Sequence, residues 1–223
     1  MTTLPPLRGV IIPVTPFQQN CSLVWCNETK RAAVVDGGGE VDRILAAAEA
    51  QGVVIEKLLV THGHLDHAGA VADLAGELGV PIEGPQREDQ FWIDGIAEAG
   101  LRYGMSGCRP FTPDRWLEEG DGVTIGAQSL SVHHCPGHTP GHVVFHHAPS
   151  QLAFVGDVLF RGSVGRSDFP RGDGAELIRS ITGKLWPLGD DVTFVPGHGP
   201  LSTFGQERRD NPFVADAVLA RRR

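Results

Sequence analysis

The chain alternates between short apolar runs and stretches whose apolar residues have helical spacing. Residues 10–36 contain the runs VIIPV, SLVWC and AAVV between polar residues, which predicts an antiparallel meander ending at the glycines 37–39. Residues 40–51 follow the spacing of an amphipathic helix, with apolar side chains at Val41, Ile44, Leu45 and Ala48. Gly52 supplies the expected helix stop.

A strand, a polar loop and a helix follow in the same order. KLLVT at 57–61 predicts the strand, and helical spacing returns at Val71, Leu74, Ala75 and Leu78, before Gly79 and Pro81. The sequence HGHLDH at 62–67 therefore lies in a loop that runs into a helix start.

The second half of the chain repeats this organisation. We expect a helix over 86–103, irregular structure over 104–120, and strands at the short apolar runs VTI, SLSV, VVF and LAFVGDVLF. A helix near 174–186 and a last strand at 192–195 complete the prediction. Two successive groups of strands and helices favour an α/β sandwich of two similar halves.

Composition and charge limit the function classes. With 223 residues, 41% hydrophobic and 21% charged, the chain is expected to form one globular domain over 1–223. Its formal net charge is -8, and its basic residues are scattered except at 221–223, which argues against nucleic acid as the main partner. No segment approaches the roughly 18 apolar residues of a membrane span, and the opening residues lack the pattern of a signal peptide. Four cysteines without a C-x-x-C pair indicate reduced thiols, so we expect a cytoplasmic protein.

The loop 62–67 concentrates potential metal ligands. It holds His62, His64, Asp66 and His67 directly after an apolar strand. Burying so many unpaired polar groups would be costly, and a solvated loop does not need this density, so metal binding is the better interpretation. His62 and His64 can point the same way from an extended turn, whereas Asp66 and His67 lie past the bend and can face a second ion.

Three later segments also end an apolar run with a possible ligand. They supply His138, Asp157 and His198. Loops at the same edge of a sheet meet on folding, so we expect two divalent ions, Zn, Fe or Mn. One ion takes the three nitrogens of His62, His64 and His138. The other takes Asp66, His67 and His198, with Asp157 between the two.

These motifs carry a resemblance to a known family. HGHLDH, HCPGHTPGH at 134–142, the Gly-Asp pair at 156–157 and PGH at 196–198 resemble the metallo-β-lactamase superfamily over nearly the whole chain. Residues 156–173 and 207–213 are similar to glyoxalase II-like proteins of the short type. The resemblance implies an αββα fold, with two mixed β-sheets flanked by helices in one domain, without a C-terminal helical glutathione-binding domain.

The chain departs from glyoxalase II in the loop that contacts the substrate. In glyoxalase II a Lys and a Tyr in the loop after the bridging Asp hold glutathione, whereas this chain has Gly-Arg-Ser-Asp-Phe at 165–169. Arg166 is our candidate for an anion contact, and a structural ion pair with Asp168 is the alternative. His142 is either packed or orients a ligand. The other histidines, 133, 134, 146 and 147, and Cys135 are expected to be structural.

Two such ions predict a hydrolase. A hydroxide held between them would attack a carbonyl carbon, with Asp66 as the catalytic residue that orients it. A thiol of pKa near 8.5 leaves without prior protonation, which favours small acyl thioesters such as S-D-lactoylglutathione as substrates. Esters or lactones come next, whereas an amine leaving group, as in a β-lactam, needs protonation first.

A redox enzyme is the main alternative. Persulfide dioxygenases resemble the same segments but use one Fe(II), which here would bind His62, His138 and Asp157. A nuclease of the same superfamily would need a basic surface, which this acidic chain lacks.

Overall fold

A computed structural model of the chain describes residues 5–221, and it contains two principal β-sheets. The first sheet has the strand order β1-β2-β3-β4-β5. Its strands are β1 (Leu7–Val14), β2 (Gln19–Cys26), β3 (Arg31–Val35), β4 (Val54–Leu59) and β5 (Ile82–Glu83). The first three strands are antiparallel and the last pairings, β3 with β4 and β4 with β5, are parallel. The predicted opening meander is confirmed.

The second sheet has the strand order β13-β12-β9-β8-β7-β6. Its strands are β6 (Gly122–Ile125), β7 (Gln128–His134), β8 (Val143–His147), β9 (Leu152–Gly156), β12 (Thr193–Pro196) and β13 (Ser202–Thr203). Only β9 and β12 run parallel. A separate hairpin joins β10 (Leu159–Phe160) to β11 (Ser163–Val164).

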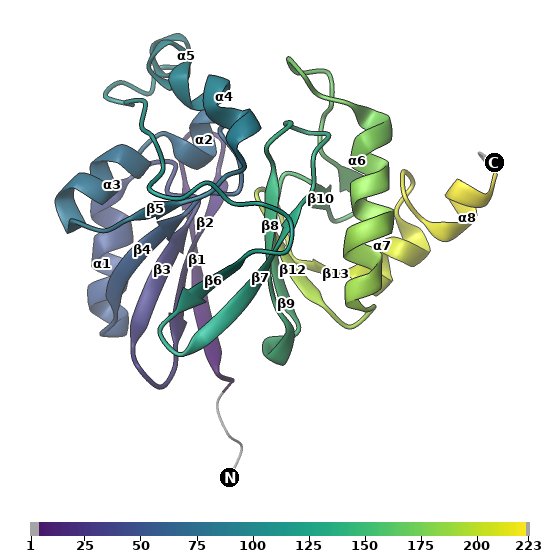
Figure 1. Cartoon of the computed structure of the whole chain (residues 1–223), viewed down its shortest axis with the longest axis horizontal. Helices are drawn as coiled ribbons and strands as arrows, with labels where there is room; N and C mark the ends of the chain where they lie inside the picture. The colour runs from purple at the N-terminus through teal and green to yellow at the C-terminus, as the bar shows by residue number, and fades with distance from the viewer. Residues whose placement is uncertain (1–4, 222–223) are drawn as a thin grey trace.

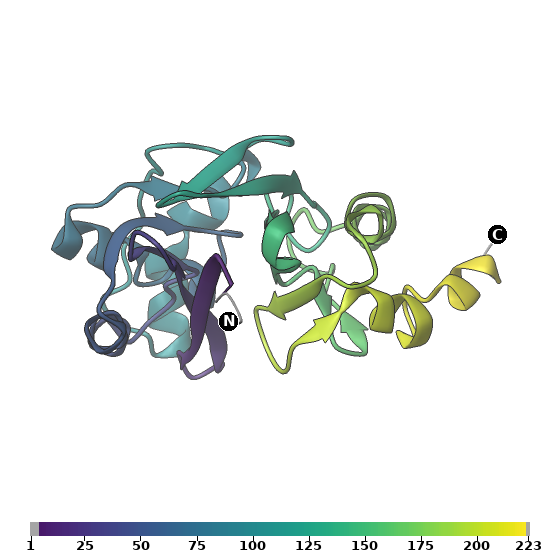
Figure 2. The same cartoon turned by 90° about the horizontal axis from the view of Figure 1, so that it is seen from below.

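Helices cover the outer faces of both sheets. The first half contributes α1 (Val41–Gln51), α2 (Leu65–Ala68), α3 (Val71–Leu78), η1 (Arg87–Asp89), α4 (Gln90–Asp94) and α5 (Ile96–Tyr103). The second half contributes η2 (Ala148–Ser150), α6 (Gly174–Ser180), the π-helical η3 (Ile181–Leu185), η4 (Trp186–Leu188), α7 (Phe204–Asp210) and α8 (Asp216–Ala220). Figure 1 and Figure 2 show α1 and α6 on opposite outer sides, with the sheets between them.

Three hydrophobic layers correspond to this arrangement. One packs the first sheet against its helices, around residues such as Leu58 and Leu74. The middle layer joins the two sheets, with Val35 and Phe145 among its buried residues. The third packs the second sheet against α6 and its neighbours, around residues such as Leu177. This is the predicted αββα sandwich of two mixed sheets. No helix among residues 5–221 combines the length and apolar character that crossing a bilayer requires.

The carboxyl ends of the strands meet at one end of the molecule. Parallel pairing brings the ends of β3 and β4 together, and likewise those of β9 and β12. A β-bridge between Gln19 and His198 links the two sheets at this end, and the Asn20 amide donates to the Gly197 carbonyl at 2.7 Å. In Figure 1 this is the end where α2 lies. Loops that leave four different strands therefore converge there.

Three element predictions differ from the structure. The segment 86–103 is not one helix but η1, α4 and α5, with Gly95 as the residue between α4 and α5. The helix predicted near 174–186 passes through α6 into the π-helical turn η3. The strand β12 is not the last, since the short β13 follows it, and α7 and α8 come after. Two-residue strands carry too little pattern to be recognised from sequence.

Candidate metal centre

Three imidazole nitrogens converge at the first predicted ligand set. His64 Nδ1 lies 3.2 Å from His62 Nε2 and 3.0 Å from His138 Nε2. Zn–N bonds of about 2.0 to 2.1 Å at tetrahedral angles would separate the nitrogens by about 3.4 Å, close to these spacings. The three side chains fit one small cation.

The second predicted set combines carboxylate and imidazole. Asp66 Oδ2 lies 3.0 Å from His198 Nε2 and 3.8 Å from His67 Nε2. Side chains of this set are more accessible than those of the first, with Asp66 18% and His198 29% exposed, although His67 is fully buried. The set therefore faces the solvent side of the site.

Asp157 lies between the two sets. Its Oδ1 is 3.3 Å from His67 Nε2, and its Oδ2 is 3.7 Å from both His138 Nε2 and His198 Nε2. The Oδ1 atom and His67 Nε2 are buried without a hydrogen-bond partner among the described residues. Buried polar atoms are rarely left unpaired, so a cation at this point would satisfy both. The structure thus brings all seven predicted ligands together: the two expected sets are present, and His62, His67 and Asp157 form a third group that overlaps both.

Hydrogen bonds behind the ligands orient four of the five imidazoles. His62 Nδ1 is 3.0 Å from the Thr61 hydroxyl, and His67 Nδ1 is 2.9 Å from the Asp36 carboxylate. His138 Nδ1 donates to the Arg166 carbonyl at 2.7 Å, and His198 Nδ1 to the Phe17 carbonyl at 3.2 Å. With the proton on Nδ1, each ring turns the lone pair of its Nε2 toward the centre, as metal-ligating histidines do.

Burial and neighbouring charges separate the two sets electrostatically. Burial, with repulsion from His138, lowers the pKa of His64 to about 3, and burial also lowers the pKa of His62 and His138. These three imidazoles are neutral at pH 7 and can offer lone pairs to a cation. Burial opposes protonation of His67, but Asp157, Asp66 and Asp36 outweigh it and raise its pKa. The same ion pairing holds the pKa of Asp157 well below its usual value, against the effect of burial.

Two buried aspartates that the sequence analysis did not single out support the ligand loops. Asp36, at the end of β3, accepts hydrogen bonds from the Thr61 amide and hydroxyl, both at 2.7 Å, as well as from His67. Asp89 accepts from the Gly63 amide at 2.8 Å, the Thr139 hydroxyl at 2.8 Å and the Gly141 amide at 2.6 Å. Asp89 thereby joins the loop of His62 and His64 to the loop of His138.

His142 both packs and positions a ligand, which combines the two alternatives considered for it. Its ring stacks on His62, with centroids 4.6 Å apart and an angle of 18°. Its Nε2 accepts a hydrogen bond from the Asp157 amide at 3.1 Å. His142 therefore fixes the backbone that carries the shared carboxylate.

Two glycines allow close approach at the centre. A Cβ at Gly38 would collide with the Asp66 carbonyl, and a Cβ at Gly197 would overlap the Asp157 carboxylate and the His67 ring. Any other residue at these positions would displace a predicted ligand.

The remaining predicted residues lie as follows. Arg166 pairs with Asp168 through nitrogen–oxygen distances of 3.0 and 2.8 Å, and both side chains are exposed. The ion-pair alternative matches this geometry, and an anion contact of Arg166 stays a prediction. The four cysteines are free, and burial raises the pKa of Cys135 to about 12, in keeping with a structural thiol. The histidines 133, 134, 146 and 147 lie on β7 and β8, outside the centre.

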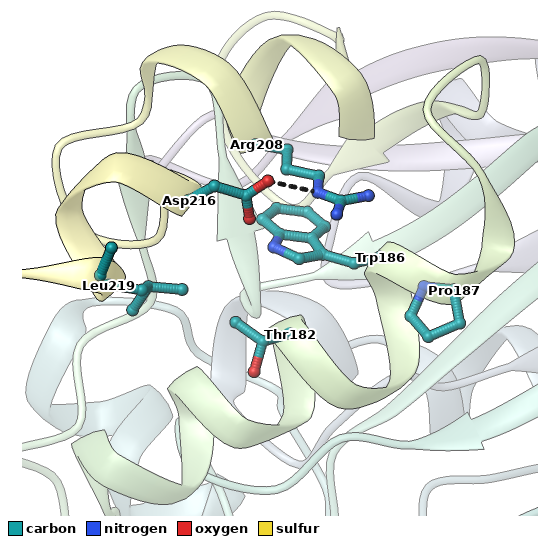
Figure 3. A pocket seen from close by; sticks show the side chains of 7 residues that line it. Thr182, Trp186, Pro187, Arg208, Asp216 and Leu219 are labelled. Carbon is teal, nitrogen blue, oxygen red and sulfur yellow. Dashed lines mark hydrogen bonds and ion pairs between the residues drawn. The ribbon is translucent and has the colours of Figure 1, made fainter. Parts of the chain in front are cut away.

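A cavity of about 630 Å³ lies apart from this centre, between η3, η4, α7 and α8. Figure 3 shows Trp186 in its wall, with Arg208 paired to Asp216 beside it. None of the seven predicted ligands lines it. The cavity is therefore not the entrance to the metal centre.

Comparisons with known proteins place this architecture in a family. The model of the metallo-beta-lactamase superfamily matches residues 14–198, so the chain belongs to this metallo-hydrolase superfamily. A fold of this family with this His/Asp cluster implies binding of divalent metal.

Individual relatives cover nearly the whole chain. A protein of Haemophilus influenzae named hydroxyacylglutathione hydrolase GloC is 47% identical, over 92% of this chain and 96% of its own length. The crystal structure of TTHA1623 in a di-iron-bound form has a TM-score of 0.83 and 38% identity, and covers 92% of this chain and 99% of that one. BLEG-1, titled a B3 metallo-beta-lactamase, has a TM-score of 0.84 and 32% identity, with 93% and 99% coverage. The resemblance inferred from the motifs is confirmed at the level of the family.

Proposed function

We propose that this protein is a binuclear metallohydrolase that cleaves small acyl thioesters of the S-D-lactoylglutathione type. The observation that carries the proposal is the position of Asp157 between two complete ligand sets. The similarity to the GloC relative and to a di-iron-bound structure supports the substrate class and the use of two ions.

The seven predicted ligands are assigned to two ions, and Asp66 has a second role. His62, His64 and His138 would hold one ion, and Asp66, His67 and His198 the other, with Asp157 in contact with both. Two bound ions would supply an activated water at neutral pH and polarise the substrate carbonyl. Asp66 would accept a hydrogen bond from the attacking water, since its carboxylate is more exposed than that of Asp157.

The leaving group selects among substrates. A thiolate departs without a proton because the pKa of a thiol is near 8.5, whereas an amine must first be protonated. Thioesters therefore fit a centre whose acids are engaged as ligands. We propose a small-molecule substrate in the cytoplasm, in keeping with four free cysteines, and neither nucleic acid nor membrane as partner.

The test combines elemental analysis with an activity assay. Protein purified without chelator should carry about two transition-metal ions per chain and should hydrolyse S-D-lactoylglutathione, followed by loss of the thioester absorbance. One Fe(II) per chain, with oxygen consumption on glutathione persulfide and no thioester cleavage, would instead establish the dioxygenase alternative.

A further inference from the structure

Aromatic rings surround the candidate metal centre. Trp92 and Phe169 lie against His64, with ring centroids at 4.4 and 4.8 Å, and Phe160 lies 6.3 Å from His198. A substrate bound at the centre would therefore lie beside apolar rings, which suit methylene groups better than charges.

One wall is extended by an exposed aromatic pair. Phe17 and Tyr103 pack edge to face, with centroids 5.6 Å apart, although 43% of Phe17 and 57% of Tyr103 remain exposed. The Phe17 carbonyl accepts the hydrogen bond from His198, so this wall is fixed to the second ligand set. Exposed aromatic surface beside a site is typical of ligand contact.

The other wall carries Arg166 and Phe169. The Arg166 guanidinium lies 4.6 Å above the Phe169 ring, and the Arg166 carbonyl accepts from His138, which fixes this wall to the first ligand set. Figure 1 places α5, which ends at Tyr103, and the segment leading into α6 at the same end of the molecule.

The two walls differ in the polar groups that they leave open. The guanidinium of Arg166 is committed to Asp168. The hydroxyl of Tyr103, the single tyrosine of the sequence, forms no hydrogen bond with any of the residues 5–221. A free phenol can donate to a carbonyl or carboxylate oxygen.

We propose that Tyr103 is a specificity-determining residue that donates a hydrogen bond to an amide or carboxylate oxygen of a peptide-like thiol, while Phe17 and Phe169 flank the methylene chain of that thiol. The inference rests on the proposed thioesterase function.

The test measures binding separately from hydrolysis. Metal-loaded full chains carrying Tyr103→Phe, Tyr103→Ala or the control Leu101→Ala, on the same helix and 78% exposed, are titrated with S-methylglutathione. Losing one hydrogen bond should raise the Kd roughly 3- to 10-fold in Tyr103→Phe, and further in Tyr103→Ala, which also loses the packing on Phe17. Leu101→Ala should bind like the wild type.

Kinetics then distinguish the thiol half of the substrate from the acyl half. KM for S-D-lactoylglutathione should rise by the same factor in Tyr103→Phe with kcat within about twofold, and KM for the lactoyl thioester of ethanethiol, whose thiol half has no amide or carboxylate, should not change. An unchanged Kd for S-methylglutathione, or equal losses on both substrates, would overturn the role of Tyr103.

Failure of the reaction has a different signature. One such result is a wild type that binds S-methylglutathione more tightly than the Tyr103 variants and yet cleaves no thioester. That result would support the Tyr103 contact and refute the proposed function. A wild type that binds no S-methylglutathione would refute the contact.

Discussion

The two ligand sets differ in their side-chain types, their burial and their charge. His62, His64 and His138 form a buried, neutral set whose loops are joined by one carboxylate, Asp89. The set of Asp66, His67 and His198 is charged and more open, and its supporting carboxylate, Asp36, contacts a ligand directly. Neutral nitrogens bind a cation without losing protons, whereas the charged set must release them. The first set is therefore a preformed site, and the second is one in which cations and protons compete.

Removing the carboxylate shared by both sets should have the largest effect. Asp157→Ala deletes a carboxylate that lies within 4 Å of ligand nitrogens of both sets, so metal content should fall below two ions and kcat/KM should drop by at least about 1000-fold. Elemental analysis and the thioester assay measure both. The exposed Asp191→Ala serves as control. A variant that keeps two ions and the full rate would refute the assignment.

Single changes in the second set test whether two ions are needed. Asp66→Ala and His198→Ala should each keep one ion in the first set and lose about 100-fold in activity, because the nucleophile and its orientation depend on both ions. The dioxygenase alternative uses only His62, His138 and Asp157. Both variants would favour it if they kept one Fe(II) and the full rate of oxygen consumption on glutathione persulfide.

The two supporting aspartates allow a matched comparison. Asp89→Asn must place an NH₂ group against a backbone amide or the Thr139 hydroxyl, since all three partners donate to Asp89. The free energy of unfolding should fall by about 1 to 3 kcal/mol, and the first-set ion should bind roughly 10-fold more weakly. Asp36→Asn should weaken the second-set ion more than the first-set ion, because Asp36 contacts His67 directly and reaches His62 only through Thr61. Denaturant unfolding and competition with a chelator measure these effects, and identical metal losses in both variants would contradict the division.

Acidification should produce the smallest effect, a few-fold difference in metal retention between the two ligand sets. In the metal-free protein the pKa values of His67 and His198 are raised by their carboxylate neighbours, against burial, so both rings take up protons as the pH falls through that raised range. The pKa values of the first-set histidines are lowered, so these rings stay neutral. Lowering the pH from 8 to 6 should therefore release the second-set ion first, as metal analysis after dialysis would show. Release of both ions in parallel would argue against the electrostatic contrast.

The ligands themselves could be predicted because their chemistry is dense in the sequence. Four potential metal ligands within residues 62–67 are too many for core packing or an ordinary solvated loop, and His138, Asp157 and His198 each follow an apolar strand. The alternation of strands and helices likewise predicted the layered fold. These features depend on local pattern, which a single sequence displays.

The supporting residues could not be predicted, because their roles depend on contacts distant in the sequence. Asp36 and Asp89 are isolated acids, and each acquires its role only when folding brings Thr61, Gly63 or Gly141 to it. The segment around Asp89 has helical spacing, which concealed the break at Gly95. The wall formed by Phe17 and Tyr103 joins residues far apart in the chain and has no local signature.

One carboxylate that serves two sites also makes their occupancies interdependent. If the first ion draws Asp157 into position, the second ion finds that oxygen already oriented, and the reverse holds by the same factor, since such coupling is reciprocal. Metal titration at pH 8 should then show the second-set ion binding more tightly to chains that already hold the first-set ion than to a variant whose first set is disabled.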